Sequence, residues 1–188
     1  MRFYKESPQT LNKVSDILKN GGVVICPTDT VYGFLADASN KKAVEKIYKI
    51  KKRPKSKPLP LFVRDIKMAE EIAFINEEQG ESLKKYWPGK FTFILKRKHR
   101  AKLYGLDKDT VALRIPNYKF LNNLLKKINM PLAQTSANVS GQPVLTNIRD
   151  IVTKFGKTDV LVVDDGNLKK SDPSKILDLT SDKIKSLR

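Results

Sequence analysis

The sequence predicts a single α/β domain, built on a twisted mixed sheet flanked by helices. Apolar residues recur at helical spacing in several segments, and short runs rich in β-branched residues lie between those segments. Some expected strands are adjacent in sequence, which favours a mixed sheet over a purely parallel, doubly wound one. The chain of 188 residues suits one domain over positions 1–188, with room for a full hydrophobic core.

The first expected elements are a helix and a buried strand. Thr10 is expected to cap a helix over Leu11–Asn20, where apolar residues recur every three or four positions. Gly21 ends that helix, as glycine commonly does at a helix C-terminus. The apolar run Val23–Cys26 then predicts a strand that is buried on both faces, and Pro27 stops it.

The later elements follow the same two periodicities. Asn40 is expected to cap a second helix, which Pro54 and Pro58 prevent from continuing. In chain order we then expect a strand at Leu59–Val63, helices at about Asp65–Ile75 and Glu77–Tyr86, strands at Phe91–Lys96 and Thr110–Ile115, a helix at Phe120–Ile128, a strand at Pro131–Thr135, a helix from Asn147 to about Phe155, and strands at Asp159–Val163, Lys175–Leu179 and Lys183–Leu187.

The chain carries a strong positive charge. Lys and Arg number 37 against 20 Asp and Glu, a net charge of +17, and basic residues cluster in runs such as K-I-K-K-R-P-K. A field of this size attracts polyanions, either nucleotide phosphates or nucleic acid. Lysine-rich, solvated helix faces explain the same composition, so the charge favours an anionic ligand without naming one.

Composition excludes several classes of protein. No segment resembles a membrane span or a signal peptide, so we expect a cytoplasmic protein without membrane association. The single cysteine, Cys26, lies in an apolar run and reads as a core residue. The single histidine, His99, lies within K-R-K-H-R, which argues against a histidine-dependent hydrolase and a zinc site. The common glycine-rich phosphate-binding motifs are absent from the sequence.

Three polar stretches remain as candidates for a site. The first, P-T-D-T-V-Y-G, follows the strand Val23–Cys26, and in an extended chain Thr28 and Thr30 would point to one side and Asp29 to the other. Polar groups at the end of a buried strand need partners or face a ligand. A Thr/Asp turn that only caps the strand is the alternative.

The second stretch is Lys51-Lys52-Arg53-Pro54, where a helix meets a proline-rich loop. In an extended segment Lys51 and Arg53 would project the same way and form a two-pronged clamp for a polyphosphate. A solvated basic loop is the alternative interpretation of the same residues.

The third stretch is T-S-A-N-V-S-G, which follows the expected strand Pro131–Thr135. Small polar residues at the carboxyl end of a strand are common at ligand sites in α/β sheets. Ser136, Asn138 and Ser140 can each bond phosphate or ribose oxygens, and Gly141 allows close approach of the backbone.

Together these motifs resemble the YrdC/TsaC family, the threonylcarbamoyl-AMP synthases that supply the activated group for N6-threonylcarbamoyladenosine in transfer RNA. Five motifs carry the resemblance over Leu11–Arg188: P-T-D-T-V-Y-G, K-x-R-P with K-P-L, W-P-G with F-T-F-I-L, T-V-A-L-R-I-P and T-S-A-N-V-S-G. The resemblance implies the short, single-domain form, with a twisted mixed, largely parallel sheet and a basic concave face.

The resemblance also implies an activity. Family members condense L-threonine, bicarbonate and ATP, with Mg²⁺ accompanying ATP, into threonylcarbamoyl-AMP and pyrophosphate. The implied partners are a downstream threonylcarbamoyl-transferase complex and transfer RNA or double-stranded RNA. In this reaction charge develops on phosphate oxygens, so positioning and Lys, Arg and Mg²⁺ electrostatics suffice without a strong protein base. A chain with one histidine fits that chemistry.

Individual roles are carried over by matching positions. The residues implied as catalytic, which would also hold the ATP phosphates, are Lys51, Arg53, Ser136 and Asn138. The further ATP contacts implied are Thr110, Ser140 and Arg188. The implied threonine-binding residues are Thr30, Arg114, Thr135 and Ser174, with Arg114 as a bidentate partner of the threonine carboxylate. No protein residue is implied as a metal ligand.

The sequence departs from the family at two positions near the threonine-binding residues. Phe62 stands where some relatives have a histidine, and Lys175 follows Ser174 where a threonine is usual. A paralogue that binds RNA or the ribosome without this activity is the main alternative. It would have no need of Ser136 and Asn138, and it would display surface aromatics for stacking. A carbamoyl-transfer domain of a hydrogenase-maturation protein would bring zinc-finger cysteines, which the sequence lacks.

Overall fold

The computed structural model describes residues 1–100, 102–169, 171–181 and 184–187. The strands within them are β1 (Arg2–Lys5), β2 (Val24–Cys26), β3 (Gly33–Asp37), β4 (Leu61–Phe62), β5 (Phe91–Lys96), β6 (Thr110–Arg114), β7 (Leu132–Ser136), β8 (Leu161–Asp164), β9 (Lys175–Asp178) and β10 (Lys185–Ser186). The helices are α1 (Pro8–Lys19), α2 (Lys41–Lys51), α3 (Ile66–Ile72), α4 (Glu77–Tyr86), α5 (Lys119–Ile128) and α6 (Ile148–Phe155).

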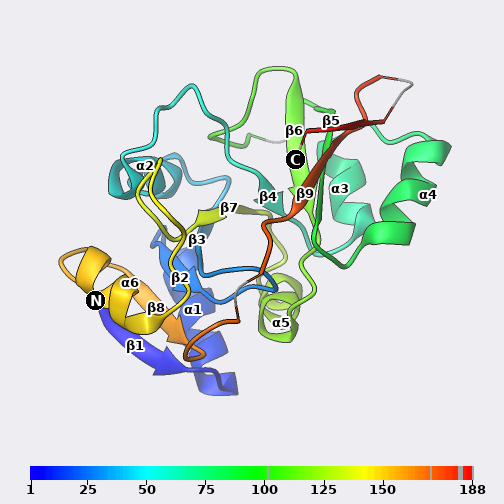
Figure 1. Ribbon diagram of the computed structural model, residues 1–188. Helices are drawn as coiled ribbons and strands as arrows, with labels where there is room; N and C mark the ends of the chain where they lie inside the picture. The colour runs from blue at the N-terminus through cyan, green and yellow to red at the C-terminus, as the bar shows by residue number, and fades with distance from the viewer. Residues whose placement is uncertain (101, 170, 182–183, 188) are drawn as a thin grey trace.

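All of these strands belong to one mixed sheet, as the sequence predicts. The strand order is β1-β8-β2-β3-β7-β4-β6-β5-β9-β10, and β1 and β10 lie at opposite ends of the molecule (Figure 1). The expectation of a largely parallel sheet is wrong: in the described part of the chain, five of nine neighbouring pairs are antiparallel. Strands joined directly, such as β2–β3 and β5–β6, must reverse direction, whereas a parallel pair needs a crossover.

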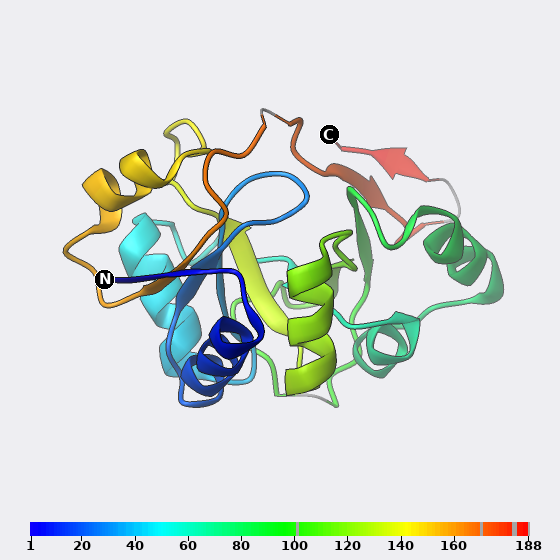
Figure 2. The same cartoon turned by 90° about the horizontal axis from the view of Figure 1, so that it is seen from below.

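Helices cover both faces of this sheet. On one face α1 and α5 lie side by side and bury Val24 and Cys26 of β2 (Figure 2). On the other face α2 and α6 pack on the alternate strand residues, whose side chains point the opposite way, such as Ile25 of β2 and Phe34 of β3. Helices α3 and α4 continue that second layer over β5 and β6. Alternation of side chains along each strand therefore divides one buried sheet between two cores.

The start of α1 differs from the prediction. The N-cap is Ser7, whose Oγ accepts a hydrogen bond from Thr10 N at 3.0 Å, and Pro8 occupies the first turn. Thr10 lies inside the helix and donates its hydroxyl to Lys5 O at 2.6 Å. Proline fits the first helical position because it has no N–H to leave unpaired, so the helix begins before Thr10.

The other helix starts follow the sequence signals. Asn40, Asn76 and Asn147 each accept a backbone N–H bond at the N-terminus of their helices. At Asn76 the cap is a full capping box, in which Gln79 bonds back to the Asn76 N–H. Among the described helices, none has both the length and the apolar character needed to span a bilayer.

Two strands lie outside the predicted elements. Strand β1 is mostly exposed and pairs only with β8, so its residues show no apolar alternation. Strand β3 is buried along its whole length and follows β2 after a short turn. At the other end of the sheet, β10 lies within the strand expected at Lys183–Leu187, of which Lys183 falls outside the described residues.

Candidate active site

A cavity of about 520 Å³ opens on the sheet face that α1 and α5 cover elsewhere. Arg114 of β6 is the register partner of Phe62 on β4, and Phe62 packs in the core beneath α5. Beyond α5 the same face is open. Its floor is made of alternate residues of three neighbouring strands: Thr92, Ile94, Thr110, Ala112, Arg114 and Ile176.

The P-T-D-T turn forms one wall of the cavity. The hydroxyls of Thr28 and Thr30 lie 2.9 Å apart, and both residues line the cavity. Asp29 points the other way, where it accepts a hydrogen bond from Arg114 Nη2 at 2.6 Å and from Asn117 N at 3.0 Å. Thr28 and Thr30 line the cavity and Asp29 does not, as the sequence predicts, but residues 29–31 form a bend held by bonds to the Thr28 hydroxyl and are not extended. The carboxylate serves to anchor Arg114.

Arg114 is held tightly by the protein. Its side chain is 3% exposed, it forms an ion pair with Asp29, and its Nε donates to Gly89 O at 2.9 Å. These bonds use the Nε and Nη2 donors of the guanidinium, so the structure fixes its orientation at the edge of the cavity. Ser174 also lines the cavity, at the same end. Its hydroxyl lies 3.0 Å from the hydroxyl of Thr92 on β5, and Thr92 is the register partner of Ile176 on β9.

The Lys51/Arg53 segment is not extended, so the expectation of two parallel prongs is wrong. Lys51 is the last residue of α2, and Lys52 adopts the left-handed conformation with φ of 50°. This helix end sends the two side chains in different directions. Arg53 lines the cavity, with Nε and Nη2 donating to Lys57 O and Pro58 O, while Lys51 is 2% exposed and points behind the cavity wall.

The T-S-A-N-V-S-G segment contributes to the cavity wall beside the P-T-D-T turn, because Gly33, which ends the P-T-D-T-V-Y-G motif, is the register partner of Ser136. Thr135 and Ser136 line the cavity, and the Ser136 hydroxyl donates to Asn138 Oδ1 at 2.6 Å. Asn138 is buried behind Ser136, and its Nδ2 donates to Gln142 O at 2.5 Å. The Ser140 hydroxyl is buried, and in the described part of the chain it has no hydrogen-bond partner.

Thr110 marks the far end of the cavity from Arg114. Its hydroxyl and backbone N–H both donate to Asp107 Oδ1, at 3.0 and 3.1 Å, and Asp107 also lines the cavity. The bonds from the backbone N–H groups and the Thr110 hydroxyl lower the pKa of Asp107, so this carboxylate stays ionised.

The structure thus brings most of the predicted site residues to one cavity: Thr30, Arg53, Thr110, Arg114, Thr135, Ser136 and Ser174. Lys51, Asn138 and Ser140 lie next to that wall and do not line it. Arg188 lies outside the described residues. The sequence analysis missed the cavity residues Thr92, Asp107, Gln134 and Ser171, which only their register or loop position could have indicated.

Among the described residues, the charged side chains that line the cavity are Arg53, Arg114 and Asp107, and Lys51 lies behind its wall. Burial, and then the neighbouring Arg53, lower the pKa of Lys51 to about 7. Burial also lowers the pKa of Arg53. Among the described residues, no group of three or more His, Cys, Asp or Glu is placed to hold a metal ion. The cavity therefore offers cationic and hydroxyl groups that suit an anionic ligand.

Comparison with known proteins places the chain in a family. The family model of Sua5, YciO and YrdC proteins, described by the words telomere recombination, matches residues 16–188. A protein of Methanocaldococcus jannaschii, named as a candidate threonylcarbamoyl-AMP synthase, is 38% identical over 196 residues, which cover 100% of this chain and 91% of that protein.

Solved structures agree with this result. A doubly substituted variant of P. abyssi Sua5 matches with a TM-score of 0.91 and 29% identity, and P. abyssi Sua5 complexed with L-threonine with 0.88 and 30%. Each match covers 100% of this chain but 56% of the Sua5 chain. E. coli YciO matches with a TM-score of 0.88 and 25% identity, over 100% of this chain and 92% of YciO. The chain belongs to the Sua5/YciO/YrdC family.

Proposed function

We propose that this protein is a threonylcarbamoyl-AMP synthase, which condenses L-threonine, bicarbonate and ATP and releases pyrophosphate. The convergence of three polar segments on one cavity carries the proposal: Thr30, Arg53 and Ser136 come from distant parts of the sequence and line the same cavity. The cavity volume of about 520 Å³ lies within the range of small-molecule sites. The name of the M. jannaschii relative and the L-threonine complex of P. abyssi Sua5 support the same activity.

The side chains at the two ends of the cavity suggest which end binds ATP and which end binds threonine. Arg53 and Ser136 supply a cation and a hydroxyl for the ATP phosphates, with Thr110 on the nucleotide side. Arg114 and Ser174 line the other end, which we assign to threonine together with Thr30 and Thr135. In this proposed division the carbamate formed on the threonine amine would lie beside the triphosphate.

The proposed reaction needs no protein base. Threonine and bicarbonate form a carbamate with loss of water, the carbamate oxygen attacks the α-phosphorus, and the bond to the β-phosphate breaks as pyrophosphate leaves. Mg²⁺ enters as part of the MgATP substrate and neutralises phosphate charge. Arg53 would stabilise the charge on the leaving pyrophosphate, while the walls hold both reactants in line.

The wider setting of the reaction is part of the proposal. The mixed anhydride product is labile, so a threonylcarbamoyl-transferase complex in the cytoplasm would take it up directly for transfer RNA. The alternative, an RNA- or ribosome-binding paralogue without this activity, leaves the cavity unexplained. The positions of Arg53 and Ser136 on the cavity wall and the similarity to named synthases favour the enzyme.

Pyrophosphate release tests the proposal. The protein is incubated with MgATP, bicarbonate and labelled L-threonine, and pyrophosphate that depends on both threonine and bicarbonate is the expected result. A folded protein that releases no such pyrophosphate would contradict the assignment.

A matched pair of variants tests the role of Arg53. Arg53→Ala should lower pyrophosphate release by about 10²-fold or more, because it removes a preorganised cation from the reacting phosphates. Lys52→Ala removes an exposed cation one residue away and should change the rate less than twofold. Equal losses in the two variants would show that only general charge matters.

A further inference from the structure

Lys51 occupies an unusual position for a charged residue. It ends α2, is 2% exposed, and its Nζ donates to Ser136 O at 2.5 Å, Asn138 O at 2.8 Å and Asn138 Oδ1 at 2.9 Å. These three bonds use all three protons of the ammonium group. All the hydrogen-bond donors of the Lys51 side chain therefore bond to protein oxygens, and Lys51 does not line the cavity.

The bonds from Lys51 determine the shape of the loop Ser136–Gln142. An ammonium group can only donate and the Gln142 carbonyl can only accept, so the Asn138 amide has its oxygen toward Lys51 and its nitrogen toward Gln142. Asn138 Oδ1 also accepts the Ser136 hydroxyl at 2.6 Å. The Lys51 carbonyl in turn accepts Ser140 N at 2.8 Å, so both ends of this residue hold the loop.

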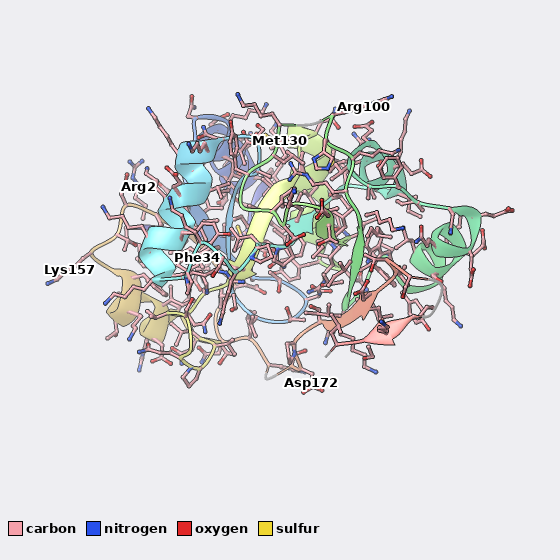
Figure 3. All side chains as sticks on the ribbon, turned by 90° about the horizontal axis from the view of Figure 1, so that it is seen from above. Arg2, Phe34, Arg100, Met130, Lys157 and Asp172 are labelled. Atoms are coloured by element: carbon pink, nitrogen blue, oxygen red, sulfur yellow. The ribbon has the colours of Figure 1, made fainter. Side chains whose placement is uncertain are left out.

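The described part of the chain provides no acidic partner for Lys51. Within the described residues, no carboxylate forms an ion pair with its Nζ at 4.0 Å or less. The charged group that acts on it is Arg53, two residues along the chain, whose positive charge adds to burial in lowering the pKa of Lys51. Strand β3 presents the ring of Phe34 (labelled in Figure 3), whose centroid lies 5.9 Å from Nζ, and the loop presents the oxygens of Ser136 and Asn138. An anion that binds near a buried lysine stabilises its charged form and so raises its pKa.

We propose that Lys51 is a positioning residue of the site, which shapes the Ser136–Gln142 loop and takes up a proton when polyphosphate binds against that loop. This inference rests on the proposed function for the identity of the ligand. The three bonds belong to the charged form, whereas burial and Arg53 lower the pKa of Lys51 to about 7, so above pH 7 the ligand-free protein favours the neutral amine, which has two protons for the three acceptors. An anion beside Ser136 restores the charged form and with it the third bond, so loop order and phosphate binding strengthen each other.

Hydrogen exchange of the ligand-free protein tests the positioning role. Lys51→Met keeps the length of the side chain and removes its donors, and Lys52→Met is the matched control at an exposed neighbour. We expect amides of the Ser136–Gln142 loop to exchange about tenfold faster in Lys51→Met, and at the wild-type rate in Lys52→Met. Unchanged exchange in Lys51→Met, whether or not phosphate binding is lost, would overturn the inference.

Calorimetry tests the proton uptake, which a merely structural lysine would not produce. Binding of Mg²⁺ with a non-hydrolysable ATP analogue is measured at pH 7.5 in two buffers of different ionisation enthalpy. With a pKa of about 7 in the free protein, wild type should take up about 0.7 proton more than Lys51→Met. Equal proton uptake by the two proteins would contradict the coupling.

A third measurement uses wild type alone, in case Lys51→Met fails to fold. In protein labelled with ¹³C at lysine side chains, one lysine should titrate near pH 7, and loop amide signals should shift with the same midpoint. A Lys51 signal that stays charged up to pH 9 would overturn the coupling. Neither this titration nor the exchange experiment requires turnover, so both stand apart from a failure of the pyrophosphate assay.

Discussion

The Asp29–Arg114 pair links two motifs that lie 85 residues apart in the sequence. The side chains of Arg114 and Asp29 are 3% and 7% exposed, and the carboxylate also accepts Asn117 N. Removing one partner of such a pair leaves the other charge largely buried without its counter-ion. Asp29 therefore holds the orientation of Arg114 at the cavity edge, whatever ligand Arg114 meets there.

Substitution of Asp29 should be costly for stability. We expect Asp29→Ala to lower the free energy of unfolding by about 3 kcal/mol, because the guanidinium of Arg114 stays buried without that carboxylate. Urea denaturation measures the change, and Asp172→Ala, at an exposed position, is the control. A loss of unfolding free energy below about 0.5 kcal/mol, the usual range for surface positions, would show that other groups fully replace the Asp29 carboxylate as partners of Arg114.

Lys51 should make stability depend on pH. Its pKa is lowered from the ordinary 10.5 to about 7, chiefly by burial. Below pH 7 the folded protein bears the full cost of a buried charge, whereas between 7 and 10.5 the folded state binds fewer protons than the unfolded state. Wild type should therefore gain stability relative to Lys51→Met as pH rises from 6 to about 9. Thermal unfolding of both proteins across this pH range measures the difference in stability. A difference that does not change with pH would exclude the lowered pKa of Lys51.

At the scale of elements, the packing of α5 on α1 supports the closed half of the sheet. Leu121, Leu124 and Leu125 are fully buried and share a core with Val14 and Leu18 of α1. The same face becomes the cavity floor beyond α5, so this helix marks where the core ends and the site begins.

Truncation of a leucine in α5 tests that packing. Leu124→Ala should destabilise the protein by about 2–5 kcal/mol, because it removes apolar contacts and leaves a cavity. Val152→Ala, at a position that is 39% exposed, should change stability by less than about 0.5 kcal/mol. Denaturant titration of both variants measures these changes in the free energy of unfolding. Similar values for the two would mean that the α1–α5 core can collapse around the deletion.

At the scale of the whole molecule, the net charge of +17 predicts a salt-dependent affinity for polyanions. We expect a transfer RNA to bind at low salt and to lose about 100-fold or more in affinity between 50 and 200 mM salt, because bound phosphates release counterions. Single-stranded DNA of equal length serves as the control and should show a similar slope. Filter binding at several salt concentrations measures both, and a transfer RNA affinity independent of salt would contradict the prediction.

The sequence by itself determined the features that depend on neighbours along the chain. Helix α4 and strand β5 have the bounds that periodicity predicts, and Asn40 and Asn147 cap their helices, because capping and amphipathic patterning act within a few residues. The motifs also indicated the family, which the comparisons confirm, and seven of the polar residues that line the cavity.

Only the tertiary structure decided which groups meet. The left-handed turn at Lys52 sends Lys51 away from Arg53, and Lys51 then finds carbonyl oxygens that lie 85 and 87 residues further along the chain. The same holds for Asp29, whose partner Arg114 follows from the register of distant strands. Such contacts depend on long-range packing, in which each buried polar group takes the partner that the fold brings near, and no local pattern encodes that choice.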